Sequence, residues 1–92
     1  MHVPVTWDPL KAASNLRKHG VTFEEALSAL HDAHAASLQD VSHSAREERF
    51  IHLGMSDRRR LVVVIYAEYG DTLRIISARV ATTTERHAYE EG

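Results

Sequence analysis

Residues 61–80 read LVVVIYAEYGDTLRIISARV, a stretch that predicts a two-stranded antiparallel hairpin. Leu61–Tyr69 is rich in β-branched and aromatic residues and is apolar at both odd and even positions. This composition is typical of a central strand that is covered on both faces. Gly70-Asp71 is a two-residue turn signal, so Thr72–Val80 is predicted as the partner strand.

The segment before this hairpin predicts two further strands. Ala35–Val41 is a weaker strand, and the polar stretch Ser42–Glu47 is a loop. Arg49–Gly54 is a strand in which Arg49, Ile51 and Leu53 share one face. Together with the hairpin these strands make an antiparallel sheet of about four strands, and His2–Trp7 is predicted as a short strand at the start of the chain.

Capping signals mark three helices. Asp8 is suited to the N-cap and Pro9 to the first position of a helix that ends at Gly20, where Leu10, Ala13 and Leu16 form a modest apolar stripe. Thr22-Phe23-Glu24-Glu25 and Thr82-Thr83-Thr84-Glu85 are capping boxes for a second helix and a short C-terminal helix. The order of elements is βααββββα, an α+β fold whose two N-terminal helices pack against the sheet.

Composition limits the class of protein. The 92 residues are 43% hydrophobic and 26% charged, which is ordinary for a globular chain and predicts one domain over residues 1–92. The absence of cysteine excludes disulfides and thiolate metal sites. The longest apolar run, Leu61–Ala67, is too short to cross a membrane, and Met1–Asp8 has no signal-peptide pattern. A cytoplasmic location is therefore expected.

Arginine dominates the positive charge. The net charge is −2, so a bulk polycation held to nucleic acid by net charge is excluded, but arginine outnumbers lysine nine to two. The guanidinium fork is suited to phosphate. In the last strand, period-two alternation predicts one face with Arg74, Ile76 and Ala78 and an opposite face with Ile75, Ser77 and Arg79.

Two groups of residues suggest chemistry, and each has a simpler structural reading. Arg79 is followed by Glu85 and Arg86 at a helix start, which is compatible with an anion site but more often indicates an Arg–Glu ion pair. His19 follows Lys18 near a helix end and is suited to proton transfer, although capping the helix carbonyls is the commoner role. Lys11 lies two turns earlier and roughly shares the face of His19.

Metal and cofactor motifs are missing from the sequence. There is no His-Glu-x-x-His pattern, no glycine-rich phosphate loop and no Gly-x-Ser-x-Gly elbow. We therefore expect neither a bound metal nor a cofactor.

An ordered set of motifs resembles the BrnT family of toxins. The N-terminal part of the resemblance is carried by Trp7-Asp8-Pro9, Lys11, Asn15-Leu16, Lys18-His19-Gly20-Val21 and Phe23-Glu24-Glu25-Ala26. The middle is carried by His43-Ser44, Glu47-Glu48-Arg49-Phe50 and Gly54, and the C-terminal part by Arg74–Arg79, Ala81-Thr82, Glu85-Arg86 and Tyr89-Glu90-Glu91. The match runs from Trp7 to Glu91, nearly the whole chain.

The resemblance implies a RelE-like ribonuclease that inhibits translation as the toxin of a type II toxin–antitoxin system. It also implies neutralisation by a BrnA-type antitoxin, contact with operator DNA only through the toxin–antitoxin complex, and an assembly such as a dimer of toxin–antitoxin pairs.

RNA cleavage without a metal needs a base for the 2′-hydroxyl proton, a cation beside the phosphate and an acid for the leaving oxygen. The candidates for phosphate stabilisation are Arg79, Arg49 and Arg86, and those for proton transfer are His19 and Glu85. Lys11, Lys18 and Arg74 are the candidates for substrate binding.

Two other functions remain open from the residues alone. In one, the chain is a non-enzymatic module whose arginine-bearing face binds an acidic partner. In the other, it binds operator DNA by itself, but the negative net charge and the lack of an evident recognition helix make this the weaker alternative.

Overall fold

The computed structural model describes residues 3–39 and 48–92. The elements follow the predicted order: β1 (Val5–Thr6), α1 (Pro9–His19), α2 (Phe23–Leu30), β2 (Ala36–Gln39), β3 (Glu48–Met55), β4 (Leu61–Tyr69), β5 (Thr72–Val80) and α3 (Thr83–Glu91). The predicted α+β fold is confirmed. Asp8, Thr22 and Thr82 cap the three helices through their side chains, and the capping box of Thr82 and Glu85 is complete.

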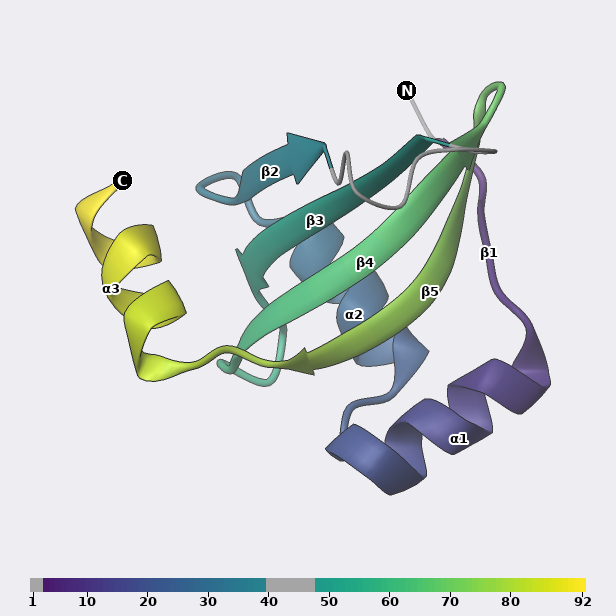
Figure 1. Cartoon of the computed structure of the whole chain (residues 1–92), viewed down its shortest axis with the longest axis horizontal. Helices are drawn as coiled ribbons and strands as arrows, with labels where there is room; N and C mark the ends of the chain where they lie inside the picture. The colour runs from purple at the N-terminus through teal and green to yellow at the C-terminus, as the bar shows by residue number, and fades with distance from the viewer. Residues whose placement is uncertain (1–2, 40–47) are drawn as a thin grey trace.

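The sheet has five strands in the order β1-β5-β4-β3-β2. The neighbours from β2 to β5 are antiparallel, as expected. β1 differs, because it joins the edge of β5 in parallel, with Val5 opposite Leu73 and Thr6 opposite Arg74. The sheet therefore has one strand more than the four-stranded antiparallel prediction and is mixed (Figure 1).

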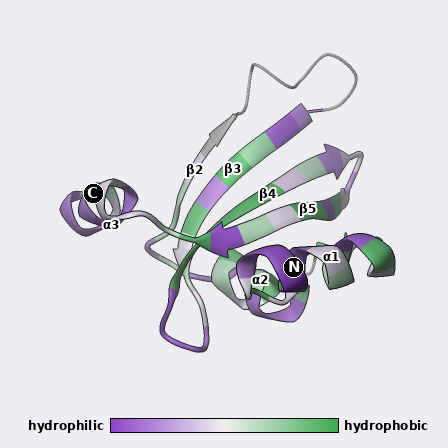
Figure 2. Ribbon diagram, turned by 60° about the horizontal axis from the view of Figure 1, so that its bottom comes forward, coloured by the Kyte–Doolittle hydropathy of each residue, from purple (hydrophilic) through white to green (hydrophobic). Residues whose placement is uncertain are grey.

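The hydrophobic core lies between the sheet and α2, which runs behind the strands in Figure 1. Its fully buried members come from α2 and the turn before it and from β4 and β5: Val21, Phe23, Ala26, Ala29, Val62, Val64, Ile75 and Ala78. In Figure 2, β4 is largely hydrophobic and α3 largely hydrophilic. We call the core side of the sheet the helix face and the opposite side the front face.

Contact between α2 and β3 is close at Gly54. A Cβ atom at this position would collide with the backbone carbonyl of Ala29 and crowd the ring of His52. His52 accordingly lies on the helix face, where its ring hydrogen-bonds the Ala29 carbonyl and the Ser37 hydroxyl. Glycine at position 54 is what lets the helix approach the strand.

The apolar stripe of α1 does not face the core. Leu10 is 80% exposed and Leu16 is 47% exposed, so this stripe is not the buried face of the helix. The buried residue of α1 is Asn15, which is 6% exposed, and the helix lies against β5. The physical reason is that α1 covers a strand edge, which offers backbone polar groups and therefore favours a polar contact.

Candidate active site

A β-bulge in β5 places the arginines of that strand on one face. Ile65 pairs with Ser77 while Tyr66 pairs with Ile75, so Ile76 is an extra residue with no partner on β4. Ile75 and Ala78 consequently both reach the core. The predicted strict alternation is therefore wrong, and Arg74 and Arg79 lie together on the front face.

Arg49 lies on the same face, because Ala67 of β4 pairs with both Arg49 and Arg74. Strands are about 4.8 Å apart, so the backbones of these two arginines are separated by roughly 10 Å. Arg79 is paired with Val63, four residues along β4 from Ala67, which is about 13 Å. The front face thus carries Arg49 and Arg74 at one end and Arg79 at the other.

A pocket of about 200 Å³ lies between α1 and β5, beside the bulge. We call it the α1–β5 pocket. It brings together Lys11, Lys18 and His19, three residues singled out from the sequence. The full lining is Lys11, Ser14, Asn15, Lys18, His19, Ile76 and Ser77.

Asn15 forms the inner wall of this pocket. Its amide nitrogen donates to the carbonyls of Ala78 (2.8 Å) and Val21 (3.0 Å), and its Oδ1 accepts the backbone N–H of Ala78 at 3.1 Å. The hydroxyl of Ser77 adds a longer contact of 3.4 Å to the same oxygen. Sequence reasoning noted Asn15 only as part of a family motif. The sequence contains only a weak indication of its role, because Asn15 is a polar residue one turn from both Lys11 and Lys18 on a predicted helix.

Arg79 is paired with Glu85 through two parallel hydrogen bonds of 2.8 Å each. This geometry confirms the ion pair that the spacing favoured. The hydrogen bonds from Arg79, with the help of the Thr82 backbone N–H, lower the pKa of Glu85 to about 2. Glu85 is therefore a carboxylate at neutral pH. Arg86, the next residue, is exposed on the first turns of α3.

The residues predicted for catalysis therefore do not surround one point. His19, Lys11 and Lys18 share the α1–β5 pocket, and the Arg79–Glu85 pair begins two residues beyond Ser77. Arg74 stands two residues before Ile76 on the other side of the bulge, whereas Arg49 is two strands away. Lys11 and Lys18 on α1 and Arg74 and Arg79 on β5 therefore lie on two adjoining elements.

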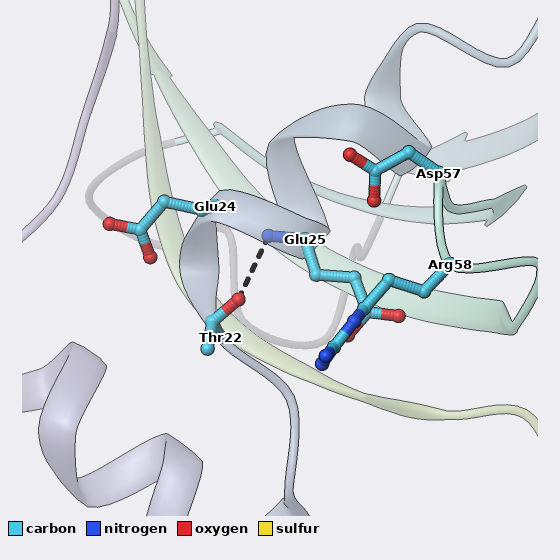
Figure 3. A pocket seen from close by; sticks show the side chains of 5 residues that line it. All are labelled: Thr22, Glu24, Glu25, Asp57 and Arg58. Atoms are coloured by element: carbon cyan, nitrogen blue, oxygen red, sulfur yellow. Dashed lines mark hydrogen bonds between the residues drawn. The ribbon is translucent and has the colours of Figure 1, made fainter.

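A larger pocket, of about 460 Å³, has the wrong charge for RNA. It lies at the start of α2 and is lined by Thr22, Glu24, Glu25, Asp57 and Arg58 (Figure 3). Arg60 is paired with the buried carboxylate of Glu25, so the carboxylates of Glu24 and Asp57 face the one guanidinium of Arg58, an excess of negative charge that disfavours a phosphate backbone. The α1–β5 pocket is therefore the better candidate for a nucleic-acid site.

Comparison with known proteins identifies the family of this chain. A family model described as the ribonuclease toxin BrnT of type II toxin–antitoxin systems matches residues 7–85. This chain belongs to the BrnT family. It is also similar to the crystal structure of the Brucella abortus ribonuclease toxin BrnT, with a TM-score of 0.63 and 25% identity over 89% of this chain and 100% of that chain. No curated protein sequence matches.

In this chain, few contacts hold α3 in place. None of its residues is buried. Tyr89 donates a hydrogen bond to Asp32, which also accepts from the backbone N–H groups of Met55 (2.7 Å) and His34 (3.0 Å). These bonds, led by that from Tyr89, lower the pKa of Asp32 to about 2. Two carboxylates, Glu85 and Asp32, thus fix the helix that carries Arg86.

Three further observations concern metal ligands, membrane spans and the motif residues of the middle segment. Within residues 3–39 and 48–92, no group of three metal-ligating side chains comes together. No helix in the same part of the chain is long and apolar enough to span a membrane. The motif residues His43, Ser44 and Glu47 lie outside the described residues.

Proposed function

We propose that this BrnT-family chain is an endoribonuclease that cleaves RNA without a metal ion, using the 2′-hydroxyl of the substrate as the nucleophile. The observation that carries the proposal is the bulge at Ile76, which places Arg74 and Arg79 on one face beside a pocket holding Lys11, Lys18 and His19. Cationic side chains on this side of the molecule match a phosphate backbone, and an imidazole is suited to proton transfer near neutral pH.

In the proposed reaction, the 2′-oxygen attacks phosphorus and the bond to the 5′-oxygen breaks. A base accepts the 2′-hydroxyl proton, an acid delivers a proton to the leaving 5′-oxygen, and a cyclic phosphate remains. His19 is our candidate for proton transfer. Lys11 and Lys18 flank it on the pocket rim and bind neighbouring phosphates, and Arg74 extends the contact along β5.

Arg79 is the proposed stabiliser of the charge that builds on the phosphate, with Arg86 and Arg49 as further phosphate contacts. The pair with Glu85 uses one N–H on each Nη of Arg79, so this carboxylate does not engage the Nε edge. That edge presents a second fork suited to a phosphate. Because the pKa of Glu85 is about 2, we assign Glu85 to orienting Arg79 rather than to proton transfer.

The biological role proposed for this activity is inhibition of translation, with neutralisation by a BrnA-type antitoxin. Operator DNA is proposed to be contacted only through the toxin–antitoxin complex, for which a dimer of toxin–antitoxin pairs is one arrangement. This role rests on membership of a family of type II toxin–antitoxin toxins.

RNA digestion by the purified, antitoxin-free protein in the presence of EDTA tests the proposal. We expect cleavage to persist in EDTA and a fully 2′-deoxy strand to stay intact. Arg79→Ala should lower the rate by about 10²–10³, the usual loss when a donor to a developing oxyanion is removed. Inertness toward several RNAs would instead favour the non-enzymatic module, and cleavage of the 2′-deoxy strand would reject the 2′-hydroxyl mechanism.

A further inference from the structure

We infer that Asn15 is a positioning residue of the ribonuclease site, holding the cationic face of α1 at a fixed place beside β5. The inference rests on the proposed function, because it concerns the rate of that reaction. It starts from a carboxamide that is 6% exposed and whose donors and acceptor are all engaged.

Asn15 takes the place of a missing strand. β1 covers the outer edge of β5 only at Leu73 and Arg74, and then the chain leaves the sheet. Farther along the same edge, the N–H and C=O of Ala78 point away from β4 and are both bound by the Asn15 carboxamide (3.1 and 2.8 Å). A side-chain amide has the same donor and acceptor as a backbone peptide, so Asn15 continues the pairing that β1 begins.

The candidate site residues of α1 surround Asn15, which anchors the helix to β5. Lys11 is four residues before Asn15, and Lys18 and His19 are three and four residues after it, so all three are its neighbours on the helix surface. On β5, Asn15 is hydrogen-bonded to Ala78, the residue directly before Arg79. The Asn15–Ala78 contact therefore connects the part of α1 that bears Lys11, Lys18 and His19 to the residue next to Arg79.

This arrangement predicts a specific kinetic signature. Replacing Asn15 leaves every charge of the site in place, so RNA affinity should change by less than about threefold. The relative position of His19 and Arg79 is no longer fixed, and a displacement of about 1 Å at a reacting centre can cost up to 10² in rate. We therefore expect kcat to fall by about tenfold or more while KM stays nearly constant.

The experiment compares Asn15→Ala, Asn15→Gln and wild type in steady-state cleavage over RNA concentrations that span KM, so that kcat and KM are obtained separately, at a temperature well below each melting point. His52→Ala is the matched control, because it also removes a buried side chain with two hydrogen bonds, but on the helix face behind the sheet. The concentration of folded protein is measured by titration with an uncleavable 2′-O-methyl RNA. His52→Ala should keep the wild-type rate per folded molecule.

If Asn15→Ala does not fold, Asn15→Gln tests the inference, because this variant keeps the carboxamide but shifts it by one methylene. A folded Asn15 variant with kcat within about twofold of wild type overturns the inference. An equal loss of kcat in His52→Ala also overturns it, since general destabilisation would then explain the effect. Failure of the proposed function gives a different result, in which wild type itself does not cleave RNA.

Discussion

Replacing the two lysines of the α1–β5 pocket with glutamine should reduce the salt dependence of RNA binding by a calculable amount. Lys11 and Lys18 are both exposed at the pocket rim. For single strands, the logarithm of the association constant falls with the logarithm of salt concentration with a slope of about −0.7 per neutralised phosphate. If each lysine contacts one phosphate, the double variant should have a slope smaller by about 1.4, twice that value.

The size of the effect is large enough to measure. Raising the salt from about 50 mM to about 200 mM is a fourfold change, and a slope difference of 1.4 then corresponds to a factor of about seven. The double variant should therefore bind more weakly than wild type at low salt and lose about sevenfold less affinity over this range. Fluorescence anisotropy with a 2′-O-methyl RNA measures binding without cleavage.

Two control variants each remove one positive charge elsewhere, for comparison with the single replacement of Lys11 or Lys18. Arg17→Gln lies on the same helix outside the pocket lining, and Arg58→Gln lies in the acidic pocket at the start of α2. Both should keep the wild-type slope. The reasoning is refuted if Arg17→Gln lowers the slope as much as a pocket lysine does, because the attraction would then be a property of the whole surface.

Three further predictions follow from individual contacts. Asp32→Asn should lower the free energy of unfolding by about 1 kcal/mol near neutral pH, since the pKa of Asp32 is about 2 against an ordinary 3.8 and the side chain is partly exposed. The contribution of the carboxylate is present above pH 3.8 and disappears as the pH falls through 2. Urea unfolding of wild type and variant should therefore give free energies that converge in acid. Gly54→Ala should cost several kcal/mol in the same assay, because the new methyl group meets the Ala29 carbonyl; a cost below about 1 kcal/mol would contradict the close packing. Glu85→Gln should leave the pH dependence of the cleavage rate between pH 5 and 8 unchanged, since the hydrogen bonds from Arg79 keep the pKa of Glu85 at about 2. A shifted pH profile would indicate that Glu85 transfers a proton.

The features that could be predicted from the sequence are those set by local physical chemistry. The capping residues Asp8 and Thr22, the box of Thr82 with Glu85 and the turn at Gly70-Asp71 each act within four residues, and the structure has all of them. The ion pair of Arg79 with Glu85 was favoured for the same reason, since a strand end and a helix start six residues apart bring the two side chains together.

The features that could not be predicted depend on segments far apart in the chain. Asn15 meets Ala78 across 63 residues, and the two residues of β1 pair with β5 across a similar separation. Hydrophobic periodicity indicates that a helix packs with its leucines, but α1 packs against a strand edge, where the backbone of β5 requires hydrogen bonds. The identity of that neighbour, and not the pattern of α1 itself, decides which face is buried.

The bulge at Ile76 connects the fold to the proposed chemistry. Arg74 and Arg79 are five residues apart, an odd number, so a regular strand would place them on opposite faces and would direct one of them into the core. One extra residue between them restores a common face and at the same time keeps Ile75 and Ala78 in the core. The bulge also brings Ile76 and Ser77 to the lining of the α1–β5 pocket. A single irregularity in β5 therefore accounts for both the shared face of the two arginines and the pocket beside them.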